Sequence, residues 1–73
     1  MSIDWQKFKA YKERMEDKEK LTNLDILVSF LKASQGLYVY DELFDVISSD
    51  DLGRSMLEKN NVKSADALMK RYF

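Results

Sequence analysis

Carboxylates are the side chains of this sequence that could best take part in catalysis or metal binding, and several of them lie in one stretch. Residues 41 to 51 contain five acidic residues and no basic one: Asp41, Glu42, Asp45, Asp50 and Asp51. Paired carboxylates can act as general acid and base, or hold Mg²⁺ or Ca²⁺. This run lacks the alternating ligands and central glycine of a calcium loop. We therefore predict no metal site here, and predict that these residues cap helices and form solvated surface.

Other kinds of site chemistry lack their usual residues. The chain has no cysteine and no histidine, which removes thiolate nucleophiles, disulfides and the usual zinc and haem ligands. It also has no glycine-rich phosphate loop. We therefore predict a protein that is not an enzyme and that needs no cofactor or metal.

Length and composition favour one small domain spanning residues 1–73. A chain of 73 residues buries little surface, so helix packing or self-association must stabilise it, and we expect a homodimer. With 45% hydrophobic residues, 34% charged residues and no proline, the composition is that of a folded helical protein. It has no apolar run of about 20 residues and no leader-like segment. We expect a soluble cytoplasmic protein without a membrane span.

The first predicted element is a charged helix over residues 4–20. Its large apolar residues recur at spacings of three, three and four, which places them on one face. They are Trp5, Phe8, Tyr11 and Met15. This stripe could pack on its own domain or form the seam of a dimer, and in the second case these four are the dimerisation residues. Both alternatives stay open at this point.

The predicted helical core covers residues 22–73. Thr22 followed by Asp25 approximates a capping box and predicts a central helix over residues 24–34, with Gly36 as its stop signal. Residues 37–40 are β-prone, but no second strand is present to pair with them. We favour a short extended connector packed over the helices.

Three further short helices follow the connector. Asp41 is the expected cap of the third, with Leu43, Phe44 and Ile47 facing inward and Val46 outward. The fourth covers residues 50–60, where Asp50 and Asp51 suit the positive end of the helix dipole and Gly53 is a mild weakness. Its expected inward residues are Leu52, Met56 and Leu57. Ser64 is the expected cap of the last helix. The predicted fold is all-α, a compact bundle of four to five short helices with one extended segment near residues 37–40.

Charge is unevenly distributed along the chain. The formal net charge is −1, yet residues 41–51 sum to −5 and residues 52–73, with five basic and two acidic side chains, sum to +3. The sequence pI is near 5.3. Proteins that contact phosphates normally present a basic face, so we do not expect direct nucleic-acid binding.

The stretch from Leu24 to Ile47 resembles the opening of a winged-helix DNA-binding domain. It has a helix, then Gly36, a short hydrophobic segment and the start of a second helix. The resemblance implies a basic recognition helix in the major groove, followed by a β-hairpin wing. A DNA-binding regulator of winged-helix or helix-turn-helix type is therefore the alternative function. Its phosphate contacts would come from Lys63, Lys70, Arg71 and Arg54.

A second resemblance lies in residues 40–44, Tyr-Asp-Glu-Leu-Phe. They resemble the short peptide that docks many proteins on the bacterial replicative sliding clamp, although Tyr40 stands where that peptide has glutamine. In size and charge richness the chain also looks like the small early bacteriophage proteins that shut down host machinery, one type of which inhibits the clamp. The resemblance implies action in the host cytoplasm.

The leading functional hypothesis is a non-enzymatic protein-binding inhibitor or modulator. The five carboxylates of residues 41–51 would face a basic surface on a partner such as a replication protein. If that surface normally binds DNA, the inhibitor would mimic DNA. Leu43, Phe44 or an exposed tyrosine would supply the buried anchor, and Tyr40 is also among the predicted partner-binding residues.

Overall fold

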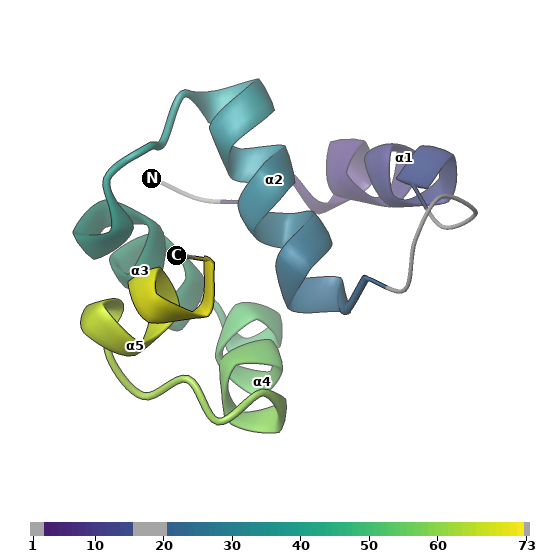
Figure 1. The fold of residues 1–73 in the computed structure, drawn as a ribbon. Coiled ribbons are helices and arrows are strands. Elements are labelled where there is room, and N and C mark those ends of the chain that lie inside the picture. Colours follow the sequence, from purple (N-terminus) through teal and green to yellow (C-terminus); the bar gives the residue numbers. More distant parts are fainter. Residues whose placement is uncertain (1–2, 16–20, 73) are drawn as a thin grey trace.

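The computed structural model describes residues 3–15 and 21–72. Within these ranges the chain forms five α-helices and no strand (Figure 1). The helices are α1 (Trp5–Met15), α2 (Asn23–Gln35), α3 (Tyr40–Ser48), α4 (Asp51–Lys59) and α5 (Ala65–Tyr72). The predicted all-α bundle is confirmed. The predicted continuation of the first helix through residues 16–20 lies outside the described residues.

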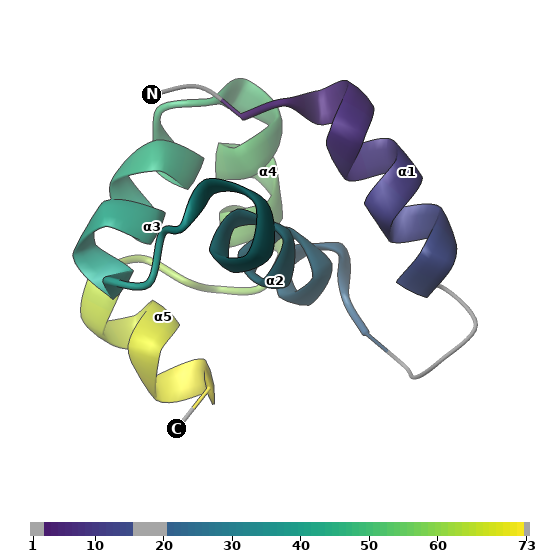
Figure 2. The ribbon, with the colours of Figure 1, turned by 90° about the horizontal axis from the view of Figure 1, so that it is seen from above.

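Helix α2 is the centre of the bundle. α1 lies on one side of it and α3 with α5 on the other, as two perpendicular views show (Figures 1 and 2). α4 packs against both α2 and α3. Because α2 is covered by neighbours, it is apolar over much of its circumference. Its buried residues are Leu24, Ile26, Leu27, Val28, Phe30 and Leu31.

Residues close to its two ends determine where α2 begins and where it ends. The Thr22 hydroxyl accepts a hydrogen bond of 3.1 Å from the Asp25 amide, and the Thr22 amide donates one of 3.1 Å to the Asp25 carboxylate. This is the predicted capping box. Gly36 ends the helix in the left-handed conformation, with φ of 65°, where its amide bonds the Leu31 carbonyl. Both predictions are confirmed.

The connector is extended and unpaired, and it leads into α3 two residues earlier than predicted. Leu37 is buried in the core, whereas Tyr38 and Val39 are exposed. Val39 is the N-cap residue, and its carbonyl accepts the Leu43 amide at 3.0 Å. The first turn therefore closes on Val39. The prediction of Asp41 as the cap is wrong, because Asp41 already lies in the first turn of the helix.

Three further predictions, all for residues of α3 and α4, differ from the structure. Leu52, expected to face inward, is 58% exposed, while Gly53 is buried. A Cβ atom at Gly53 would lie 2.3 Å from the Ile47 carbonyl oxygen, so the glycine permits close helix contact and is no mere weakness. Val46, expected to face outward, packs against the core. The close contact between Gly53 and Ile47 sets the orientation of α4, and in this orientation Leu52 faces solvent.

Candidate functional site

The aromatic stripe of α1 packs on its own domain. Phe8 is only 6% exposed and meets Phe30 edge-on, with ring centroids 5.7 Å apart. Tyr11 also contacts Phe30 and shares a hydrogen bond of 2.6 Å with the Ser29 hydroxyl. Trp5 packs edge-on against Phe8 at 5.3 Å, and Met15 is half-buried. Within the single chain the stripe packs internally, as the first alternative expected, and a dimer seam formed by its partly exposed residues stays a prediction.

Asp50 has a structural role and does not belong to a free acidic surface. Its carboxylate accepts the Trp5 indole N–H at 3.0 Å and caps α4 by accepting the amides of Leu52 and Gly53. The hydrogen bond from Trp5, assisted by those amides, lowers the pKa of Asp50 below its usual 3.8. These three hydrogen bonds give the Asp50 carboxylate a role inside the fold, and its part in binding a partner stays a prediction.

Of the clamp-like peptide, Leu43 and Phe44 face the protein interior, whereas Tyr40 is half-buried. Leu43 is completely buried, and Phe44 packs against the core. The Tyr40 ring stacks on Tyr72 with centroids 6.3 Å apart, and its hydroxyl accepts a hydrogen bond from Lys32. Residues 40–44 form the start of α3. The completely buried Leu43 offers no exposed surface to a partner in this conformation, and the role of Tyr40, Leu43 and Phe44 in binding stays a prediction.

The remaining carboxylates lie on the outer face of α3. Asp41, Glu42 and Asp45 are exposed, and no ion pair to them occurs within the described part of the chain. α3 itself contains no basic residue that could neutralise them. Asp51 is exposed too, but it is paired with Arg54. Of the five predicted carboxylates, three are therefore exposed and without an ion pair within the described residues, and all three lie on α3.

An open groove of about 410 Å³ borders this acidic face. Its walls come from the connector with the start of α3, and from α5. Its lining residues are Tyr38, Val39, Tyr40, Asp41, Ala65, Asp66 and Met69. Three of them are large apolar residues that face solvent: Tyr38 is 67% exposed, Val39 55% and Met69 38%. The groove therefore combines an apolar wall with two carboxylates, those of Asp41 and Asp66.

Sequence reasoning missed Tyr38, Val39 and Met69 as site residues. Alternation in an extended segment places Tyr38 opposite the buried Leu37. The same rule would place Val39 inward, whereas Val39 is exposed, so alternation alone does not identify the apolar wall. Nothing local placed Met69 beside the connector, since that proximity depends on how α5 packs.

A second groove, of about 360 Å³, lies on the other side of Tyr38. Its lining residues are Asp25, Val28, Ser29, Lys32, Ala33, Tyr38 and Tyr72. Its polar groups already bond to the chain itself: Lys32 donates to the Tyr40 hydroxyl at 2.9 Å, and Tyr72 donates to Asp25 at 2.7 Å. Tyr38 is the wall that the two grooves share.

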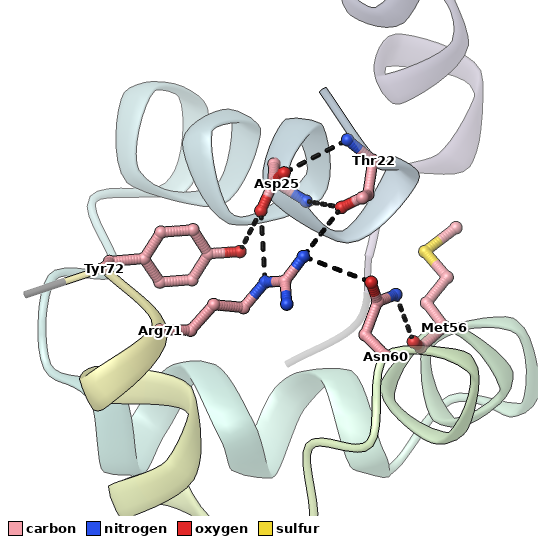
Figure 3. Close-up of polar contacts among 6 residues, drawn as sticks. All are labelled: Thr22, Asp25, Met56, Asn60, Arg71 and Tyr72. Carbon is pink, nitrogen blue, oxygen red and sulfur yellow. Dashed lines mark hydrogen bonds and ion pairs between the residues drawn. The ribbon is translucent and has the colours of Figure 1, made fainter. Parts of the chain in front are cut away.

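A polar network ties α5 to α2 and α4 (Figure 3). The Asp25 carboxylate accepts hydrogen bonds from the Tyr72 hydroxyl at 2.7 Å and from Arg71 Nε at 3.3 Å. The Arg71 guanidinium also donates to Thr22 Oγ1 and Asn60 Oδ1, at 3.4 and 3.1 Å. Burial alone raises the pKa of Asp25, but hydrogen bonds from Tyr72 and Thr22 and the Arg71 charge outweigh it, and the pKa is lowered. For Tyr72, burial and then the Asp25 carboxylate raise the pKa.

Three of the four basic residues of the DNA-binding alternative are paired with the chain's own carboxylates. Arg71 bonds to Asp25, Arg54 to Asp51, and Lys70 to Asp66 at 3.0 Å. The described residues also contain no strand that could form a wing. This geometry gives no support to a phosphate-binding face.

No group of three or more acidic residues within residues 3–15 and 21–72 has the geometry to hold a metal ion. No helix in those ranges has both the length and the apolar character that a membrane span requires. No family model, curated protein or solved structure matches the chain.

Proposed function

We propose that this protein is a non-enzymatic protein-binding module whose site is the groove between the connector and α5. One observation carries the proposal: exposed Tyr38, Val39 and Met69 lie in the same groove as the carboxylates of Asp41 and Asp66. Clustered apolar side chains on the surface of a small domain typically mark an interaction site. The partner it fits has a basic surface with an apolar side chain at its centre.

Charge and apolar contact have separate roles in this proposal. Glu42 and Asp45 extend the negative field along α3, beyond the groove itself. Such a field speeds encounter with a basic partner and rejects acidic ones, while the buried apolar contact slows dissociation. The anchor is therefore Tyr38 with Val39 and Met69, in place of the inward-facing Leu43.

The basic surface of the partner would have a function of its own. If the basic surface normally binds DNA, the carboxylates would occupy phosphate positions, and the protein would inhibit by competition. A bacteriophage protein acting on a replication protein such as the sliding clamp, in the cytoplasm of its host, fits this form. Binding to purified clamp, with and without primed DNA, tests the clamp assignment directly.

Site-specific photo-crosslinking tests the general proposal. Benzoylphenylalanine would replace Val39 in the groove, and in a control protein Lys9, which is exposed on α1. Both proteins would be irradiated in a bacterial lysate at about 50 mM and about 500 mM salt, since salt screens exposed charges. Support is a protein captured only from position 39, less at high salt and less after Asp41→Lys with Asp45→Lys. Equal capture from both positions, or indifference to the charge reversal, would rule the groove out.

A further inference from the structure

The tyrosines of this chain show a pattern that singles out Tyr38. The sequence contains four tyrosines, and three of them have a cation near the ring. The guanidinium carbon of Arg14 lies 5.8 Å from the Tyr11 ring centroid. The Lys32 ammonium lies 4.8 Å from that of Tyr40, and the guanidinium carbon of Arg71 lies 6.0 Å from that of Tyr72. Tyr38, the most exposed of the four, has no such cation among the described residues.

The surroundings of Tyr38 suit a cation supplied from outside. Asp41 and Asp66 line the same groove, so negative charge stands beside the exposed aromatic ring. Asp41 has no ion pair in the described part of the chain. Asp66 is paired with Lys70, but both side chains are largely exposed, and an exposed pair of this kind exchanges partners at little cost.

The chain itself contains an example of the arrangement. Arg71 bonds to the Asp25 carboxylate at 3.3 Å and lies near the Tyr72 ring, so one guanidinium contacts both a carboxylate and an aromatic ring. Arginine suits both contacts, because its flat guanidinium stacks on rings and presents a rigid fork of donors to carboxylates. Lysine offers a compact, strongly hydrated charge without the flat surface.

We propose that the partner's binding residue is an arginine, whose guanidinium covers the Tyr38 ring and bonds to the Asp41 carboxylate. A neighbouring apolar side chain of the partner packs on Val39 and Met69. This inference rests on the proposed function and adds the chemistry of the contact. It distinguishes an arginine-bearing partner from one that is merely basic.

Two synthetic peptides test the inference. Both have eight residues of alternating leucine and a basic residue, which is arginine in one and lysine in the other. Binding to the ¹⁵N-labelled protein would be followed through amide chemical shifts. The variants are Tyr38→Phe, which keeps the ring, Tyr38→Leu, which removes it, and Asp41→Asn. Glu13→Gln on α1 is the charge-matched control. Because the side chains of Tyr38 and Asp41 are exposed and form no hydrogen bond within the described residues, these variants should fold.

The expected result is specific to the groove. The arginine peptide shifts the amides of residues 38, 39, 41 and 69, and binds about threefold to fivefold more tightly than the lysine peptide. Tyr38→Phe preserves that preference and Tyr38→Leu abolishes it. Asp41→Asn weakens binding of the arginine peptide about fivefold or more, because a charge-assisted bond is lost. Glu13→Gln changes nothing.

The remaining outcomes separate this inference from the proposed function. Equal affinity of both peptides for the groove would overturn the arginine assignment and leave a groove that binds basic partners. Shifts confined to other surfaces would overturn it too, and the crosslink at position 39 would then decide the proposed function. Groove shifts that grow with protein concentration, without peptide, would show that a second copy occupies the groove and would overturn both.

Discussion

The hydroxyl of Tyr72, in the last turn of α5, donates a hydrogen bond of 2.7 Å to the carboxylate of Asp25, in the first turn of α2. α5 packs mainly against α3, with Leu68 buried and with Ala67 and Tyr72 against the core. The contacts of Tyr72 and Arg71 with Asp25 fasten its C-terminal end to the centre of the bundle (Figure 3). Since α5 forms one wall of the proposed groove, this contact also shapes the candidate site.

Replacing Tyr72 with phenylalanine should weaken this attachment. The ring remains to stack on Tyr40, but the hydrogen bond to the charged Asp25 is lost. We expect the free energy of unfolding, measured by urea titration, to fall by about 1 to 2 kcal/mol. Tyr38→Phe is the matched control, because within the described residues the Tyr38 hydroxyl has no partner. Similar losses in both variants would contradict the prediction.

Acid should destabilise the fold through Asp25 and Asp50. Both have a pKa lowered in the folded state, so between the folded and unfolded pKa values the unfolded chain binds more protons. Their stabilising contribution is complete above the unfolded value of about 3.9 and is lost as the pH falls through the folded values. Urea titrations from about pH 6 to pH 2 measure this slope. Asp25→Asn with Asp50→Asn should flatten this slope.

Sequence reasoning succeeded where the determining contacts are local. The capping box of Thr22 with Asp25 and the stop at Gly36 lie within a few residues of the helix ends that they control. The exposed carboxylates of Asp41 and Glu42 were equally readable, because the sequence around them supplies no basic neighbour.

Sequence reasoning failed where a distant helix decides the role of a residue. The sequence indicated the role of Asp50 at the start of a helix, but not the hydrogen bond that Trp5, 45 residues away, donates to it. The apolar pattern of α4 placed Leu52 inward, but the close approach of Gly53 to Ile47 sets the rotation of that helix. The groove depends on α5 lying beside the connector, which no local spacing encodes.

Gly53→Ala tests the close approach of α4 to α3. Alanine favours a helix over glycine by about 1 kcal/mol, yet the added methyl group would lie 2.3 Å from the Ile47 carbonyl oxygen. We expect the clash to prevail and the free energy of unfolding to fall by about 1 to 3 kcal/mol. Ser34→Ala, on the exposed end of α2, supplies the comparison, since it gains helix propensity without a clash. A more stable Gly53→Ala protein would show that the helices can separate without cost.

Trp5→Phe tests the link from α1 to the cap of α4. Phenylalanine keeps an aromatic ring against Phe8 but cannot donate to Asp50. Because that hydrogen bond is the largest influence on the Asp50 carboxyl, its pKa should rise toward 3.8. Carboxyl carbon shifts followed through an NMR pH titration of the variant and the unaltered protein would measure this. An Asp50 pKa that stays where it is in the unaltered protein would mean that the cap amides alone control it.

Phe8→Leu distinguishes the two alternatives for the aromatic stripe. In the structure Phe8 fills space against Phe30 within one chain, so the smaller side chain should lower the free energy of unfolding by about 1 to 2 kcal/mol. Because the contact lies within one chain, that loss should be independent of protein concentration. Urea titrations over about a hundredfold range of concentration, with sedimentation equilibrium on both proteins, would measure it. An unaltered protein whose midpoint rises with concentration, and a variant that loses this dependence, would place Phe8 in a dimer seam instead.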